Sequence, residues 1–127
     1  MLGAMPLTLE PAPGYTICHG SPRDPLWEYV FDTRAASFAM ADLATARCCV
    51  GHTHLQATFR AGNRTMINPG SVGQPRDGDP RAGYALLEPK AGKVTFRRVA
   101  YDIAETQRRM RARKLPDMLV DRLSFGL

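Results

Sequence analysis

Two histidines, His52 and His54, stand one residue apart in the stretch VGHTH, residues 50–54. In an extended segment their side chains project to the same side, with Cα atoms roughly 6.5–7 Å apart. Two imidazoles can then bind one divalent ion, or each can bind one of two ions about 3.5–4 Å apart that share a water and clamp a phosphoryl group. The alternative is a polar turn in which both rings only form hydrogen bonds.

The third histidine, His19, occupies a similar place in the sequence. It follows a β-favouring run, residues 15–18, and adjoins a glycine, as the His52 and His54 pair also does. Ligand sites collect where the strands of layered sheets end. We therefore expect the three histidines to bind metal rather than to form a simple turn.

The three cysteines, Cys18, Cys48 and Cys49, do not suit a disulfide framework, because their number is odd and two are adjacent. This pattern fits a reducing compartment. Zinc bound by Cys48 or Cys49 together with histidines is disfavoured, since strand alternation turns only one of the two toward a given face. The same alternation separates Cys18 from His19 as a nucleophile and its base. We expect buried, apolar thiols.

A glycine- and proline-rich stretch, residues 68–83, predicts a long shaped loop. Its glycines let backbone N–H groups approach an anion, and Arg76 can pair with phosphate through two hydrogen bonds. A rigid turn with a solvated arginine explains the same composition. Arg23, four residues after His19, has the same two interpretations.

The elements that must position these residues form a mixed α and β layered architecture. Strand, hairpin and helix patterns recur along the chain without an internal repeat. We predict strands at 15–18 and 47–50, hairpins of 55–60 with 65–67 and of 84–87 with 94–99, and helices at 35–46, at a start near 27–31, after Asp102, and at Pro116–Leu123.

Composition narrows the class of protein. The net charge is +5, with 44% hydrophobic and 23% charged residues, and no apolar stretch reaches the ~20 residues of a membrane helix. The opening residues lack the features of a secretory signal, so a cytoplasmic location is expected. The positive charge suits an anionic partner such as a phosphate ester. Nucleic acid is disfavoured as a partner, because aromatic residues do not alternate with the basic ones.

Three motifs carry a family resemblance: HGSPRDPLWEYV, VGHTHLQ and INPGSVGQPRDGDPRAGYALLE, in this order. They resemble the carboxy-terminal half of calcineurin-like metallophosphoesterases of the small bacterial and archaeal type, from about Leu7 to the end. The resemblance implies a four-layer α/β/β/α sandwich with mixed sheets, β-hairpins and C-terminal helices. Residues 1–127 would form a single partial domain, the second half of that sandwich.

The resemblance also implies residue roles around two divalent ions, typically manganese, iron, zinc or nickel. His19 and His52 are similar to ligands of the second ion, and His54 to a ligand of the first. The residues expected in the loops beside the substrate are Arg23, Asn68, Gly70, Ser71 and Arg76. The implied reaction is hydrolysis of phosphomonoesters or phosphodiesters.

The chain departs from the family pattern in one respect. Its sequence contains no D-x-H, no G-D-x-x-D or N, and no G-N-H. Three neutral imidazoles cannot offset the charge of two divalent ions, which normally have carboxylate ligands. We therefore expect weak metal binding and little activity from these residues alone, together with self-association or pairing with a missing N-terminal half.

The sequence is compatible with two functions. The first is a metal-dependent phosphoesterase to which these residues contribute half of the metal ligands. The second is a non-catalytic binding or assembly module for anionic partners, derived from the same fold.

Overall fold

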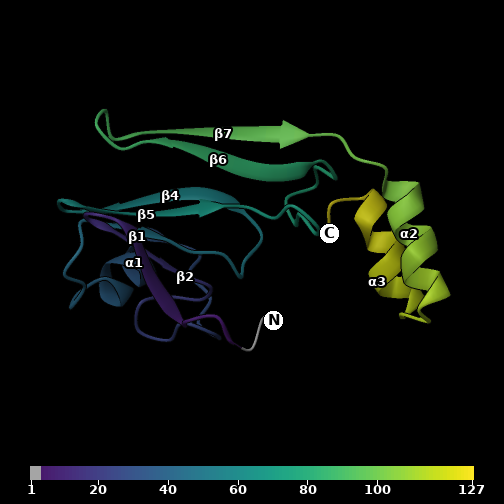
Figure 1. The fold of residues 1–127 in the computed structure, drawn as a ribbon, viewed down its shortest axis with the longest axis horizontal. Coiled ribbons are helices and arrows are strands. Elements are labelled where there is room, and N and C mark those ends of the chain that lie inside the picture. Colours follow the sequence, from purple (N-terminus) through teal and green to yellow (C-terminus); the bar gives the residue numbers. More distant parts are fainter. Residues whose placement is uncertain (1–3) are drawn as a thin grey trace. The chain divides into compact units, whose positions relative to one another are not determined.

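The protein is described here by a computed structural model, in which residues 4–127 are placed (Figure 1). The chain forms two compact units. The first comprises the residues up to 53 together with 57–69, and the second comprises 54–56 together with 70–127. His19 and His52 belong to the first unit, and His54 belongs to the second. The expected mixed α/β class is confirmed.

The first unit is built on a five-stranded mixed sheet in the order β1-β2-β3-β5-β4. β2 pairs with β1 antiparallel and with β3 parallel, and β3 pairs with β5 parallel. A two-residue turn joins β4 to β5 as the predicted hairpin. The strands are β1 (Thr8–Ala12), β2 (Tyr15–Cys18), β3 (Arg47–Cys49), β4 (Gln56–Ala61) and β5 (Arg64–Pro69).

β1 is not among the elements predicted from the sequence. It carries Pro11, which lacks the N–H needed in the middle of a sheet and is tolerated at an edge. β1 is such an edge strand, and four of its five residues are exposed. The alternation of apolar and polar residues that identifies a half-buried strand is therefore weak here.

Helix α1 (Thr33–Ala39) packs on this sheet but is shorter than predicted. Asp32 caps it by accepting a hydrogen bond from the Ala35 N–H at 2.7 Å. The predicted end at residue 46 is wrong, because the helix stops at Ala39. The Arg64 guanidinium donates to the carbonyl groups of Met40 and Ala41, so these acceptors have a partner outside the helix.

The predicted helix start near residues 27–31 is also wrong. Residues 25–27 form a turn instead, in which the Asp24 carboxylate accepts hydrogen bonds from the N–H groups of Leu26 and Trp27 at 3.2 and 3.1 Å. Short polar side chains stabilise turns in this way in competition with helices. Val30 then enters the core with 3% of its surface exposed.

The core of the first unit lies between α1 and the sheet. Its largest fully buried side chains include Met40 and Met66, and Cys18 and Cys48 lie beside them. Hydrophobic burial of this kind is the main favourable contribution to folding. The members of the cluster are Cys18, Val30, Ala36, Ala39, Met40, Cys48, Val50 and Met66.

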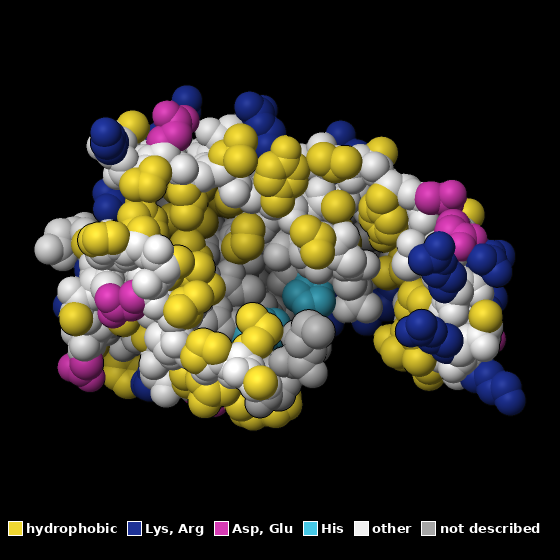
Figure 2. Space-filling view, viewed as in Figure 1, with side chains coloured by type: hydrophobic (Ala, Val, Ile, Leu, Met, Phe, Trp, Pro, Cys, Tyr) yellow, Lys and Arg dark blue, Asp and Glu magenta, His cyan; other side chains and the backbone are white. Residues whose placement is uncertain are grey.

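The second unit contains the predicted loop, a hairpin and the C-terminal helices. β6 (Ala82–Glu88) and β7 (Lys93–Val99) pair antiparallel without a break, and α2 (Ile103–Ala112) begins at the predicted cap Asp102. α3 (Asp117–Asp121) and the 3-10 helix η2 (Arg122–Ser124) follow. Figure 2 shows Lys and Arg side chains gathered over these helices. None of the helices within residues 4–127 is long and apolar enough to cross a bilayer.

Asp79 anchors the loop before β6. Its lowered pKa makes the stability of the fold depend on pH. The Asp79 carboxylate accepts hydrogen bonds from the Arg81 guanidinium and backbone, at 2.7 to 3.2 Å, and lies 4.0 Å from Arg98. These contacts, chiefly the side-chain hydrogen bonds from Arg81, lower the Asp79 pKa from 3.8 to about 2. A carboxylate with a lowered pKa stabilises the fold at higher pH, and its contribution is lost as the pH falls through this range.

We therefore expect Asp79→Asn to flatten the pH dependence of stability between about pH 4 and pH 2. Urea unfolding across this range measures the effect, with the exposed Asp42→Asn as the matched control. An unchanged slope for the Asp79 variant would contradict the assignment.

Candidate metal centre

Two adjacent strands bring His19 and His52 to the same edge of the first unit's sheet. β2 and β3 run parallel with Ile17 opposite Cys49, so both strands end together. The Gly51 N–H donates to the His19 carbonyl at 2.8 Å and extends this pairing past the strand ends. Residues 33 positions apart in sequence therefore meet where a parallel sheet usually holds its ligands.

The two rings face each other through nitrogen atoms. His52 Nδ1 lies 2.9 Å from His19 Nε2, and the ring centroids are 4.8 Å apart at an interplanar angle of 72°. Two nitrogens that bind one ion at about 2.1 Å in neighbouring octahedral positions lie about 3 Å apart. The separation is that of a hydrogen bond between the two rings, and it also matches the spacing of two adjacent ligands of a single divalent ion. Among residues 4–127 no group of three or more His, Cys, Asp or Glu could hold a metal ion.

The turn that carries His52 is not the extended segment that the sequence predicts. His52 and His54 both have a φ of 63°, in the left-handed region that non-glycine residues rarely adopt. Between them, the Thr53 N–H donates to the Gly51 carbonyl at 2.7 Å. The alternation argument for the two side chains is therefore wrong, and the backbone is strained as it often is at functional sites.

Asn68 holds this turn from the neighbouring strand β5. Its side chain is buried, with 1% exposed, and its Nδ2 donates to the Gly51 carbonyl at 2.6 Å and to Thr53 Oγ1 at 2.9 Å. Burial of an amide is favourable only when its hydrogen bonds are made. Asn68 therefore fixes the backbone on both sides of His52.

His54 has a defined ring orientation within the second unit. Its Nδ1 lies 2.6 Å from the Gln74 carbonyl oxygen, which can only accept, so Nδ1 donates. In the neutral ring the lone pair is then on Nε2, the nitrogen that could bind a metal ion. A carbonyl partner of this kind is common for metal-binding histidines.

The predicted loop residues Gly70, Ser71 and Arg76 lie with His54 in the second unit. Gly70 has a φ of 86°, and a Cβ there would come within 2.8 Å of Gln56 Cγ, so glycine is required. Ser71 Oγ accepts from the Gln74 N–H at 2.9 Å and shapes the turn. Arg76 Nη2 donates to Gln74 Oε1 at 3.0 Å, while its buried Nε has no hydrogen-bond partner in the described part of the chain.

Arg23 has protein partners of its own in the first unit. Its guanidinium pairs with Glu28 and lies 4.2 Å from the centroid of the Phe38 ring. The side chain remains half exposed. These contacts give it a structural role in addition to the predicted place near His19.

The cysteines are free thiols, as expected. Cys18 and Cys48 are buried, with their sulfur atoms 3.9 Å apart, and Cys49 is partly buried. The hydrogen bond with Cys18, together with burial, raises the pKa of the Cys48 thiol. A protonated, buried thiol is unreactive and a poor metal ligand.

Sequence reasoning missed two aromatic neighbours of His52. The Tyr29 ring lies 3.9 Å from the His52 ring, centroid to centroid, at a tilt of 32°, and the Trp27 ring lies 6.5 Å away at 74°. The sequence pattern that could have revealed these neighbours is the alternation of aromatic residues in WEYVF, residues 27–31. A helix start was expected there instead.

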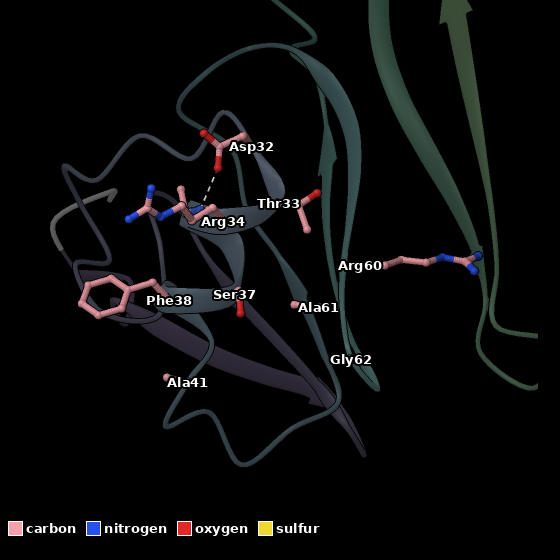
Figure 3. A pocket seen from close by; sticks show the side chains of 10 residues that line it. Asp32, Thr33, Arg34, Ser37, Phe38, Ala41, Arg60, Ala61 and Gly62 are labelled. Atoms are coloured by element: carbon pink, nitrogen blue, oxygen red, sulfur yellow. Dashed lines mark hydrogen bonds between the residues drawn. The ribbon is translucent and has the colours of Figure 1, made fainter.

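An open groove of about 1180 Å³ lies elsewhere in the first unit, between α1 and β4. Figure 3 shows Thr33 and Ala61 between the helix and the strand, whereas the side chains of Arg60 and Phe38 extend away from that space. Small side chains line much of it, and none of its lining residues is a histidine. The groove is therefore separate from the histidine pair.

Comparisons with known proteins relate the chain to one family. The description of the family model that matches residues 7–92 is "Calcineurin-like phosphoesterase superfamily domain". An uncharacterized protein of Methanocaldococcus jannaschii is 35% identical over 125 residues, which cover 85% of this chain and 50% of that protein. A metallophosphoesterase of Sphaerobacter thermophilus, solved by crystallography, is 42% identical with a TM-score of 0.92, over 99% of this chain and 60% of that one.

A hypothetical protein of Pyrococcus horikoshii has the same fold. It is 23% identical with a TM-score of 0.87, over 99% of this chain and 53% of that chain. The chain thus spans 50% of the M. jannaschii relative and 60% and 53% of the two solved structures.

Proposed function

Because the chain belongs to the calcineurin-like phosphoesterase superfamily, we propose that it supplies metal ligands to a metal-dependent phosphoesterase acting on phosphomonoesters or phosphodiesters. The observation that carries the proposal is the 2.9 Å approach of His52 Nδ1 to His19 Nε2 at the ends of two parallel strands. The match to the Sphaerobacter metallophosphoesterase supports it.

The proposed ligands are the three histidines of the chain. His19 and His52 would bind one divalent ion, and His54 would bind the other through Nε2, with manganese, iron, zinc or nickel as the metal. When bound, such a pair of ions supplies a nucleophilic water at neutral pH and offsets charge on the phosphoryl group.

Other residues of the chain would orient these ligands and the substrate. The Asn68 amide fixes the turn that bears His52, and the Gln74 carbonyl fixes the proton on His54 Nδ1. By resemblance to the family motif, Arg76, in the loop after Gly70 and Ser71, would at most neighbour the substrate phosphate, to which a guanidinium can form two parallel hydrogen bonds.

We further propose that the carboxylate ligands come from polypeptide outside these 127 residues. Two divalent ions require negative ligands, and the sequence contains none of the family's D-x-H or G-D-x-x-D motifs. This chain covers only 50% to 60% of the length of these relatives. Either a longer form of the same chain or a second chain would then complete the site.

Hydrolysis of bis(p-nitrophenyl) phosphate tests the proposal. We expect the protein expressed with its natural flanking sequence to hydrolyse this diester only with added Mn²⁺, and to lose activity on chelation. The 127-residue chain alone should show little turnover, because half of its ligands are missing.

Absence of metal-dependent hydrolysis in the longer protein would refute the phosphoesterase function. Binding of phosphate esters without turnover would instead favour the non-catalytic module. Equal turnover by the 127-residue chain would refute the proposal that the carboxylates lie elsewhere.

A further inference from the structure

Three aromatic side chains form an exposed strip beside the histidine pair of the first unit. Trp27, Tyr29 and Phe31 alternate along the chain and are 72%, 45% and 61% exposed. We call these three residues the aromatic strip. Single exposed apolar residues are ordinary, but adjacent exposed rings mark binding surfaces.

The segment that carries the aromatic strip is held firmly in the first unit. Val30, between Tyr29 and Phe31, is buried in the core, and Glu28 accepts hydrogen bonds from Ser21 and Arg23. The preceding turn is closed by the Gly20 N–H, which donates to the Pro25 carbonyl at 2.7 Å. The rings are thus presented by a fixed backbone, which reduces the entropy lost when a ligand binds.

Tyr29 of the aromatic strip packs against the His52 ring, and Phe31 packs against Tyr29. Tyr29 lies 3.9 Å from His52, and Phe31 lies 5.6 Å from Tyr29 with the two rings parallel within 2°. Trp27 meets His52 edge to face at 6.5 Å. A ligand whose phosphate is at the histidine pair would therefore have its organic group next to these rings.

We propose that the aromatic strip binds a planar ring, such as a nucleobase, in the organic part of the phosphate ester; this inference rests on the proposed phosphoesterase function. Aromatic side chains stack on bases regardless of base identity, because every base has a π-face. Trp27 offers the most exposed ring, and Tyr29 lies closest to the histidine pair. Esters with a ring close to phosphorus are preferred over those with a flexible alkyl group.

The size of the aromatic strip favours a small ligand over a second protein. Fully buried aromatic side chains contribute about 150–250 Å² each, so the exposed parts of these three amount to about 270–450 Å². A stable protein interface takes about 800 Å² from each partner. The aromatic strip matches a single ring system instead.

Trp27 is the one tryptophan of the 127 residues, so its fluorescence reports directly on the aromatic strip. The probe is adenosine 5′-monophosphate, and the ring-free control ligand is glycerol 2-phosphate. We expect saturable quenching by the nucleotide alone, in the chain without added metal. Tyr29→Leu and Phe31→Leu should each raise the nucleotide Kd about tenfold, which is the usual effect of losing one stacking ring.

Phe125→Leu is the matched control, because Phe125 is 62% exposed and lies in the second unit. It should leave the Kd unchanged. In the longer protein, Trp27→Leu should raise KM for an aryl phosphodiester and leave KM for a dialkyl phosphodiester unchanged.

The outcomes separate this inference from the proposed function. Absence of quenching, or equal quenching by glycerol 2-phosphate, overturns the ring-binding site even if hydrolysis is metal-dependent. A concentration-dependent blue shift of Trp27 emission with dimer formation in sedimentation also overturns it, since a second copy then covers the aromatic strip. Ring-specific quenching supports the site, and failure of hydrolysis in the same preparation counts against the phosphoesterase function alone.

Discussion

Replacing His52 with glycine is expected to abolish the proposed metal-dependent hydrolysis, measured in the protein with its flanking sequence, while leaving the fold intact. Loss of a residue that merely supports a ligand lowers metal affinity or activity 10- to 100-fold, so loss of the ligand itself should exceed about 100-fold. Glycine accepts the φ of 63° at this position without strain, so the turn should keep its backbone conformation. Initial rates with Mn²⁺ and urea unfolding measure the two effects.

Lys114→Gly provides the matched control for the backbone. Lys114 also has a positive φ, of 57°, and it is exposed at the end of α2. This variant should keep full activity. If the His52 variant retained more than about a tenth of the activity, the assignment of His52 as a metal ligand would be wrong.

Replacing Asn68 with alanine is expected to lower both stability and metal affinity. The change removes the buried Asn68 amide and its 2.6 and 2.9 Å hydrogen bonds to the Gly51 carbonyl and Thr53 Oγ1. The free energy of unfolding should fall by about 2–3 kcal/mol. Because Asn68 supports the turn of His52, the affinity for Co²⁺ or Mn²⁺ should fall about 10- to 100-fold. Urea unfolding and metal titration measure these values.

Thr53→Val separates the positioning role of Asn68 from simple stability. It removes the hydrogen bond between Asn68 Nδ2 and Thr53 Oγ1 and keeps the volume, so a loss of about 1 kcal/mol is expected, with a smaller change in metal affinity. An Asn68→Ala variant that loses stability but binds metal as tightly as the natural protein would limit Asn68 to a structural role.

The elements that local patterns specify were predicted well. β2 and β3 are short β-favouring runs that end before glycine, and the β6–β7 hairpin and the cap at Asp102 follow from turn and capping chemistry. The family resemblance rested on ordered motifs, and the match over residues 7–92 confirms it. His19 and His52 were proposed as partners from those motifs, and the structure brings their rings together.

Features that depend on contacts between residues far apart in the sequence could not be predicted from local patterns. The carbonyl groups that follow the end of α1 have a partner in Arg64, 25 residues beyond the helix. Edge strand β1 depends on pairing with β2 rather than on its own alternation. The left-handed backbone at His52 depends on support from Asn68, so periodicity alone suggested an extended segment. Tyr29 reaches His52 only because Val30 anchors its segment in the core.

The backbone at the two histidines limits which residues could replace them as the proposed metal ligands. Apart from glycine, asparagine and aspartate tolerate a φ near 63° best, and of these only aspartate offers a carboxylate to a divalent ion. A change from His52 or His54 to aspartate would replace a neutral nitrogen donor with a charged oxygen donor on a backbone that aspartate tolerates. Cysteine or glutamate at position 52 or 54 would also offer a metal-binding atom, but the positive φ of the backbone there disfavours both residues.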